Sequence, residues 1–175
     1  YHLTRHNVGF AFVEQLAESY SATFKLEKKF KAFIARSTID GVDCLLLKPD
    51  AFMNLSGEAV LKAAHFYKIT ANNIIVAHDD LDLNCGAGKW KLGGGHGGHN
   101  GLRDITNRLG TQQYYRLRIG IGHPGAAHLV TNFVLSRPAK NEESDIQAVI
   151  NQAERTLPFL LHGDLQQAMN ELHAL

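Results

Sequence analysis

Hydrophobic residues gather in short segments along the chain, some as unbroken apolar runs and others alternating with polar residues. Both patterns are typical of β-strands when turn-forming residues flank them. Strands are predicted in FKAFIARSTI from Phe30, DCLLLKP from Asp43, NIIVAHD from Asn73, AGKWKL from Ala87 and YYRLRIGIG from Tyr114. We therefore expect five strands at intervals between Phe30 and Gly122.

A second pattern repeats apolar residues every three or four positions, which predicts helices with one buried face. In NVGFAFVEQLAESY this face holds Val8, Phe12, Val13, Leu16 and Ala17. In LSGEAVLKAAHFY it holds Leu55, Ala59, Leu61, Ala63 and Phe66. A third helix is predicted in DIQAVINQAERTLPFLL, after a loop in SRPAKNEESD around Pro138.

Strands that alternate with helices are typical of an α/β fold. We expect residues 1–175 to form a single domain, a three-layer α/β/α sandwich with a mixed, largely parallel sheet. In open α/β sheets, ligands bind beyond the carboxyl ends of the strands. The residues that follow the predicted strands are therefore the first candidates for a functional site.

The composition limits which partners the chain can bind and indicates the cellular compartment in which it works. The net charge is +1, so a nucleic acid would have to be bound by a local basic cluster. No apolar run approaches the ~20 residues of a membrane span, and the first residues do not resemble a signal peptide. Cys44 and Cys85 lack the spacing of a zinc or redox site, which favours a reducing cytoplasm.

Three aspartates follow the apolar segment IIVAH, at Asp79, Asp80 and Asp82. An oxygen-rich cluster suits a divalent cation such as Mg²⁺. Aspartates are also common turn and cap residues, and one buried aspartate can orient a catalytic histidine. His6, just before the first predicted helix, is the histidine that fits this last role, although it also fits a helix cap.

Asparagine side chains lie in two further loops. Asn54 lies in FMNLSG, after the segment DCLLLKP, and Asn100 closes the glycine-rich stretch GGGHGGHNG. Such amides can bind a carbonyl, an oxyanion or a water, and they also cap helices. Ser56 lacks the G-x-S-x-G surroundings of a nucleophilic serine. His96 and His99, three positions apart, are a candidate metal pair.

The stretch KLGGGHGGHNGL lacks both common nucleotide-binding glycine patterns, but its glycines allow a ligand to approach the backbone closely. Beside it, Lys89 and Lys91 alternate with Trp90, so the two ammonium groups share one face of a strand. Arg116 and Arg118 repeat this spacing. The four cations can form a phosphate clamp if their strands are neighbours and their faces agree; otherwise they are solvated surface charges.

The segments TRHNVGF, KPDAFMNLSGEAV, VAHDDLDL, KLGGGHGGHNGLRDI and YRLRIGIGHPG occur in the order seen in bacterial peptidyl-tRNA hydrolases. The chain resembles this family from Tyr1 to the C-terminal helices. The resemblance implies a single α/β domain with a mixed sheet, monomeric and without cofactor or metal. It also implies an esterase that releases the peptide from peptidyl-tRNA and so recycles tRNA from chains released early by the ribosome.

The resemblance assigns roles to individual residues. The catalytic histidine corresponds to His6, which would activate a water, and its supporting aspartate corresponds to Asp79. Contacts with the end of the tRNA correspond to Tyr1, Phe52, Asn54 and Asn100. The basic clamp for the 5′ phosphate corresponds to Lys89, Lys91 and Arg118.

Two features of the family are missing from the sequence. A strand and an Asn-Pro-Gly turn precede the position of Tyr1 in the family, so we expect a chain that is N-terminally truncated relative to it. The basic residues common around positions 126–129 are replaced by AAHL. A non-catalytic RNA-binding module therefore stays an alternative. A metal-dependent hydrolase that uses Asp79, Asp80 and the two histidines of HGGH is another.

Overall fold

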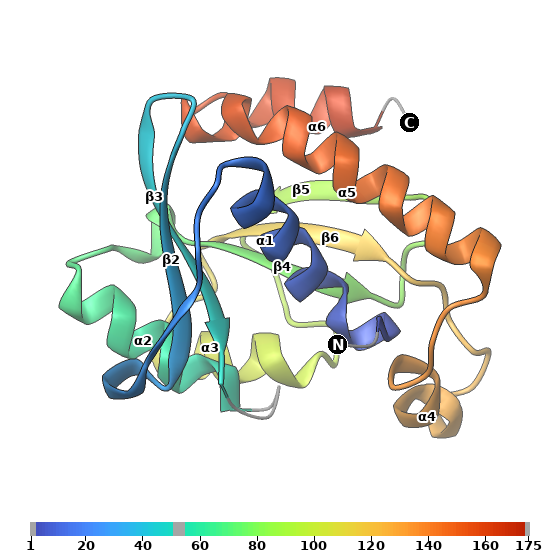
Figure 1. Ribbon diagram of the computed structural model, residues 1–175. Coiled ribbons are helices and arrows are strands. Elements are labelled where there is room, and N and C mark those ends of the chain that lie inside the picture. Colours follow the sequence, from blue (N-terminus) through green and yellow to red (C-terminus); the bar gives the residue numbers. More distant parts are fainter. Residues whose placement is uncertain (1–2, 51–54, 174–175) are drawn as a thin grey trace. The chain divides into compact units, whose positions relative to one another are not determined.

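The computed structural model describes residues 3–50 and 55–173 of the chain (Figure 1). Two compact units are distinguished by their internal contacts and are described separately. Unit 1 comprises Tyr1–Glu14, Val76–Lys91 and Arg116–Leu175, and unit 2 comprises Gln15–Ile75 and Leu92–Tyr115. Within the described ranges, every helix is too short or too polar to cross a membrane.

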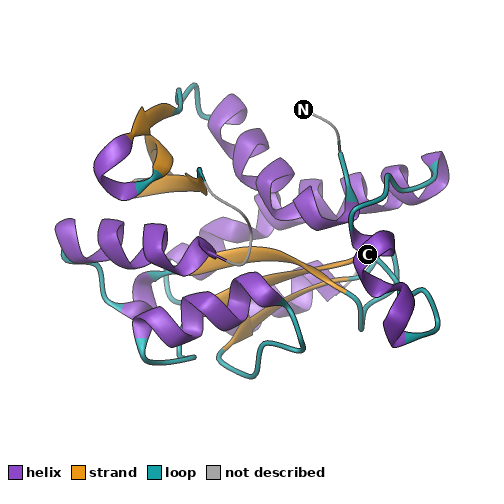
Figure 2. Ribbon diagram, turned by 90° about the horizontal axis from the view of Figure 1, so that it is seen from below, coloured by secondary structure: helices purple, strands orange, loops and turns teal. Residues whose placement is uncertain are grey.

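A three-stranded sheet lies mainly in unit 1, in the order β4 (Ile75–Asp80), β6 (Tyr115–Gly120), β5 (Gly88–Leu92). β4 and β6 are parallel. Both strands end at the same edge of the sheet, where the amide of Ile121 donates to the Asp80 carbonyl. β5 runs antiparallel to β6, and the Gly120 amide donates to the Ala87 carbonyl. Figure 2 shows the three strands side by side. The expected mixed sheet is confirmed.

Two helices of unit 1 pack on one face of this sheet, the first half of α1 (Val8–Ser19) and α5 (Lys140–Leu161). The other helices of unit 1 are η1 (Arg5–Asn7), η5 (Ala127–Leu129), α4 (Val130–Val134) and α6 (Leu165–His173). Gly88 and Trp90 share one face of β5. Gly88 lies directly under Val149 of α5, and the Trp90 indole N–H donates to Thr156 at 2.9 Å. The Trp90 ring also meets Phe12 of α1 edge to face.

Unit 2 contains an antiparallel sheet in the order β1 (Lys25–Glu27), β2 (Ala32–Ile39), β3 (Val42–Pro49). Asp40 and Gly41 join β2 to β3 with φ values of 49° and 80°, the conformation that an Asp-Gly hairpin turn adopts. The remaining elements are η2 (Lys28–Phe30), α2 (Ser56–Phe66), η4 (Ala71–Asn73) and α3 (Asn100–Leu109). The core joins Phe30, Ala32 and Ile34 to Ala59 and Ala63 of α2.

The predicted strands correspond to β2 to β6, with ends within two residues of those expected. Among the described strand pairs, only β4 and β6 are parallel. The parallel share of the sheet is therefore smaller than expected, because the two-residue turn between β2 and β3 permits only an antiparallel hairpin.

Three predictions about helices need correction. α3 is absent from the predicted helices, and α5 begins at Lys140, inside the predicted loop, because Glu142 accepts a hydrogen bond from the Ala139 amide at 3.0 Å and caps the helix. On α2, Leu61 and Phe66 do not share the buried face with Ala59 and Ala63: they are 37% and 55% exposed. The exposed Phe66 ring instead packs edge to face against buried Phe30 and half-buried Tyr67.

Candidate active site

A histidine and an aspartate that are far apart in the sequence meet in unit 1. Nδ1 of His6 lies 2.9 Å from Oδ2 of Asp79, whose side chain is only 4% exposed. Burial by itself lowers the pKa of His6, but the hydrogen bond and the charge of Asp79 outweigh it, so this pKa is raised above 6.5. A neutral His6 that donates its Nδ1–H to the carboxylate carries its lone pair on Nε2. The pair therefore has the arrangement of an oriented general base.

The start of α1 places His6 against β4. His6 lies in the 3-10 turn η1, and α1 follows directly at Val8, which is fully buried. A Cβ on Gly9 would lie 2.2 Å from the Ala77 carbonyl oxygen of β4. The helix can approach the strand this closely only with a glycine at that position. Two residues beyond Ala77, Asp79 points to the same face of β4 and meets His6.

Replacing Gly9 with alanine is expected to separate α1 from β4. Overpacking of a tight contact costs about 1–3 kcal/mol of unfolding free energy, and the shift of η1 weakens the bond between His6 and Asp79. Urea unfolding measures the first effect, and an NMR titration of His6 measures the second, because the bond to Asp79 raises the pKa of His6. Gly95→Ala is the matched control, because a Cβ at that position would have no atom within 4 Å and stability should not change. Wild-type stability of Gly9→Ala would contradict the close-contact argument.

Arg5, next to the histidine, ties η1 to the segment around α4. Its guanidinium donates to the Phe133 carbonyl at 3.3 Å and to the Ser136 hydroxyl, forms an ion pair with Glu142 at 3.1 Å, and lies over the Phe133 ring. The Arg5 amide also donates to the Ser136 carbonyl. Arg5 is only 8% exposed, so these contacts are largely shielded from water. Together they hold the turn that carries His6 in place.

A row of basic side chains lies on the other face of the sheet in unit 1. The bond between Gly120 and Ala87 sets the register of β5 and β6, which places Lys89 opposite Arg118 and Lys91 opposite Arg116. Lys89 and Lys91 are exposed and Trp90 is buried, so the two lysines share one face of β5, as the alternation predicted. Arg118 is 23% exposed, whereas Arg116 is 2% exposed. The neighbouring strands and matching faces that a clamp requires are both present.

The two adjacent aspartates of DDLD do not converge on one ion. Asp79 bonds His6 on one face of β4, and Asp80 bonds Nε of Arg118 at 2.7 Å on the opposite face. Alternate residues of a strand point to opposite sides, so the two carboxylates diverge. Asp80 also accepts the Asp82 amide through Oδ1 at 2.8 Å. This geometry argues against a cation held by Asp79 and Asp80 together.

The glycine-rich stretch, in unit 2, ends in a helix. His99 caps α3 by accepting the Leu102 amide at Nδ1, 3.2 Å away, and His96 accepts the Gly98 amide at 3.0 Å. Both histidines therefore support the local backbone. Gly93 and Gly98 have φ values of 73° and 81°, which favour glycine whether or not a ligand approaches. Asn100 is the first residue of α3 and is exposed.

The predicted residues Tyr1, Phe52 and Asn54 lie outside the described residues. The helix that follows Asn54 in the chain, α2, packs against α3 in unit 2. The Gly57 amide donates to Oδ2 of Asp104 on α3 at 2.6 Å, and a Cβ on Gly57 would lie 2.4 Å from the Asp104 carbonyl oxygen. This contact joins the start of α2 to the helix that begins with Asn100.

Comparison with known proteins shows the family to which the chain belongs. The family model described as "Peptidyl-tRNA hydrolase" matches residues 1–175. The chain belongs to the peptidyl-tRNA hydrolase family. It is 49% identical over 174 residues to the peptidyl-tRNA hydrolase of Neisseria meningitidis serogroup A, covering 99% of this chain and 91% of that one. It is 51% identical over 175 residues to the enzyme of Pectobacterium atrosepticum, covering 99% and 90%.

Solved structures of the peptidyl-tRNA hydrolase family also match. The crystal structure of peptidyl-tRNA hydrolase from Acinetobacter baumannii superposes with a TM-score of 0.95 and 46% sequence identity, covering 98% of this chain and 87% of that chain. A complex of peptidyl-tRNA hydrolase with n-propanol gives the same TM-score and identity. The α/β fold of the family is therefore the fold of this chain.

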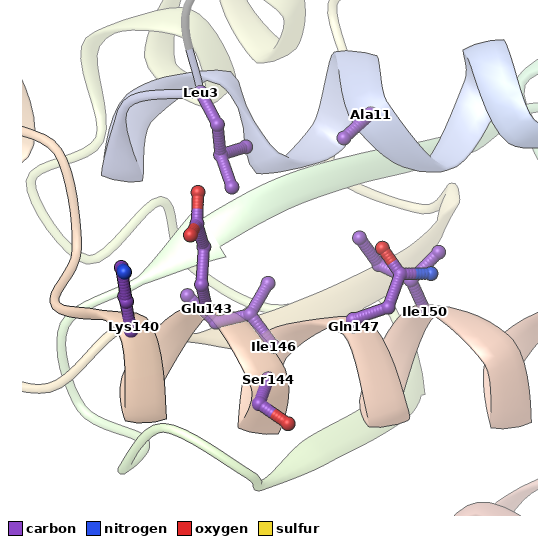
Figure 3. A pocket seen from close by; sticks show the side chains of 8 residues that line it. All are labelled: Leu3, Ala11, Lys140, Glu143, Ser144, Ile146, Gln147 and Ile150. Carbon is purple, nitrogen blue, oxygen red and sulfur yellow. The ribbon is translucent and has the colours of Figure 1, made fainter.

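Unit 1 contains a pocket of about 320 Å³ that lies apart from His6 and Asp79. It is lined by Leu3, Ala11 and six residues of α5. Figure 3 shows the Glu143 side chain directed from α5 toward Leu3. The lining lacks the histidine and the aspartate, so the pocket does not mark the candidate site.

The cysteines take no evident part in the site. Both are free thiols. Burial, followed by the nearby Glu142 carboxylate, raises the pKa of Cys85 to about 11, and burial likewise raises the pKa of Cys44. A thiol with a raised pKa is a poor nucleophile at neutral pH.

Sequence reasoning missed two residues that support the site. Arg5 stands inside the segment TRHNVGF, but its partners lie more than 125 positions away, and only the folded chain brings them together. Asp80 fits a metal ligand or a cap when the sequence is considered alone. The alternation of side chains along a strand was the signal that could have separated it from Asp79.

Proposed function

We propose that this chain hydrolyses the ester bond between the peptide and the tRNA in peptidyl-tRNA, and so recycles tRNA from chains released early by the ribosome. The observation that carries the proposal is the 2.9 Å contact between His6 and the buried Asp79. Membership of the peptidyl-tRNA hydrolase family supports the substrate class. We further propose that residues 1–175 act as one catalytic domain, monomeric and cytoplasmic, without cofactor or metal.

The proposed mechanism uses a water activated by His6. An ester between an aminoacyl group and ribose is already activated, so a positioned water and a base suffice without a covalent intermediate. Nε2 of His6 takes a proton from the water as the oxygen attacks the ester carbonyl. Asp79 fixes the tautomer of His6 and stabilises the imidazolium that forms. The proton then passes to the ribose oxygen as the ester bond breaks.

Two asparagines are proposed to bind the reacting end of the substrate. Asn100 stands exposed at the start of α3, where its amide N–H groups can donate to a carbonyl oxygen that becomes negatively charged. Such a donor contributes up to ~4 kcal/mol to transition-state stabilisation when well placed. Asn54 is proposed for the same site because α2, the helix that follows it, packs on α3. Tyr1 and Phe52 are proposed as further contacts with the end of the tRNA.

Lys89, Lys91 and Arg118 are proposed to bind the 5′ phosphate of the tRNA. Replacing Lys91 with alanine is expected to raise KM about tenfold, because a hydrogen bond from a charged donor contributes roughly 1.5–3 kcal/mol. The value of kcat should stay the same, since the phosphate lies away from the ester. Steady-state kinetics on substrates with a 5′ phosphate and with a 5′ hydroxyl measure the effect.

The matched control for Lys91 is Lys25→Ala, an exposed lysine on β1, which should leave KM unchanged on both substrates. An equal rise in KM for Lys91→Ala on both substrates would rule out the phosphate as the partner of this lysine.

The activity itself is tested by comparing N-acetylated aminoacyl-tRNA with free aminoacyl-tRNA. We expect the wild-type chain to release the acetylated amino acid and to act slowly on the free one. A non-catalytic RNA-binding module would bind tRNA and release neither. Repeating the assay with a chelator tests the metal-dependent alternative, which predicts loss of the activity.

A further inference from the structure

Asp80 belongs to the basic face of the sheet and not to the catalytic pair. Its side chain, 12% exposed, accepts Nε of Arg118 at 2.7 Å through Oδ2. Its other oxygen, Oδ1, accepts the Asp82 amide at 2.8 Å. Both oxygens of the carboxylate are thus held, one by the arginine and one by the backbone at the end of β4. The carboxylate is a fixed anchor for Arg118.

The nitrogen through which Arg118 bonds Asp80 decides which of its N–H groups are left to donate to a phosphate. A guanidinium carries one N–H on Nε and four on the two terminal nitrogens. Asp80 contacts Nε, so the terminal nitrogens form the edge turned away from that contact. Two parallel N–H groups on such an edge match two oxygens of a phosphate. An arginine held in this way needs less ordering when the phosphate arrives.

The cross-strand register places a second cation beside this edge. Lys89 lies directly opposite Arg118 on β5, and directly opposite residues have Cβ atoms about 5 Å apart. Lys91 is on the same face. In the described part of the chain, neither lysine forms an ion pair, whereas Arg118 pairs with Asp80. Asp80 therefore pairs with the charge of Arg118 and leaves the positive charges of the two lysines unpaired by it.

We propose that Asp80 is a positioning residue for phosphate binding: it holds Arg118 by Nε so that the terminal nitrogens and the neighbouring lysines bind the same phosphate. This inference rests on the proposed 5′-phosphate clamp. Two effects of the carboxylate oppose each other. Its charge repels a phosphate, and its hydrogen bond orients the arginine. The repulsion is reduced because the charge is already paired with Arg118, so the orienting effect dominates.

The test compares Asp80→Ala, Asp80→Asn and the wild-type chain on tRNA substrates with a 5′ phosphate or a 5′ hydroxyl. Asp80→Ala should raise KM about fivefold on the phosphorylated substrate, a factor that corresponds to roughly 1 kcal/mol, and should leave kcat unchanged. Asp80→Asn keeps an oxygen within reach of Nε and should remain within about twofold of the wild-type KM. On the 5′-hydroxyl substrate, all three proteins should have the same KM.

Asp82→Ala is the matched control, because it removes one exposed carboxylate from the same turn. If charge alone governs binding, Asp80→Ala and Asp82→Ala would both lower KM, and the proposal would be overturned. An equal rise in KM for Asp80→Ala on both substrates would also overturn it, since that result indicates general damage to the fold. In an Arg118→Ala background, Asp80→Ala should have no further effect on KM.

The wild-type chain separates this inference from the proposed clamp. If the wild-type chain has the same KM with and without the 5′ phosphate, the clamp itself is wrong and Asp80 has no phosphate to serve. If the wild-type chain prefers the phosphate and Asp80→Ala keeps that preference in full, the clamp stands and only the role of Asp80 is wrong.

Discussion

Replacing His6 with alanine is expected to lower kcat for peptidyl-tRNA hydrolysis about 10²- to 10⁴-fold, the range associated with a general acid or base. The expectation rests on the buried partner of His6: with Asp79 fixed at Nδ1, Nε2 is the nitrogen that takes the proton from water. The measurement is single-turnover release of peptide from peptidyl-tRNA, which isolates the chemical step from product release.

Binding provides the control for His6→Ala. The dissociation constant for tRNA should stay close to the wild-type value, because the basic side chains lie on the opposite face of the sheet. A thermal melt checks that the variant is folded. A single-turnover rate near that of the wild-type chain would remove His6 from the mechanism, and a parallel loss of binding and rate would indicate unfolding instead.

Replacing Asp79 with asparagine is expected to lower the maximal rate on the order of 10²-fold or more, because the amide no longer enforces the tautomer or stabilises the imidazolium. It should also move the pH profile. In the proposed mechanism His6 acts as a base only when neutral, so the rate should fall as the pH drops through its pKa. Asp79 raises this pKa above 6.5 against the lowering effect of burial. Without the carboxylate, burial acts alone, and the acid limb moves to lower pH.

A pH series of kcat/KM for both proteins measures this shift. Asp82→Asn, in the same turn but exposed, should keep both the wild-type rate and the wild-type acid limb. If the acid limb of Asp79→Asn coincides with that of the wild-type chain, the titrating group is not His6. If the rate is unchanged as well, Asp79 does not support the base.

Local patterns predicted much of the fold because the responsible forces act between near neighbours. The alternation of Lys89, Trp90 and Lys91 predicted that the two lysines share one face of β5 and that the indole lies on the other. The apolar face of α2 was harder. Leu61 and Phe66 have the helical spacing of a core face, yet aromatic contacts hold Phe66 at the surface. Such contacts with residues 30 and 67 cannot be read from one helix.

α3 was missed for a different reason. The helix follows a run of glycines of the kind that is typical of loops, and they mask the apolar spacing of Leu102 and Ile105, which are both buried. Gly110, with φ 71°, ends the helix and donates its amide to the Thr106 carbonyl. This glycine and the histidine cap at the other end are signals of a helix that the sequence contains.

The site was predicted unevenly. Family resemblance pointed to His6 and Asp79, and their contact is present in the structure. Pattern alone left Asp79 with three possible roles, because only long-range packing decides which carboxylate meets the histidine. The partners of Arg5 and Arg118 likewise come from distant elements, so no local spacing could have identified them.

Asp79 and Asp80 are adjacent on β4 and have partners on opposite faces, so their roles depend on the length of this strand. One carboxylate serves the histidine and the next serves the arginine on the opposite face. Inserting or deleting one residue in β4 before Asp79 would exchange the faces of both carboxylates, and neither would then reach its partner. Point substitutions in this strand alter one role at a time, whereas a change of length removes both roles together.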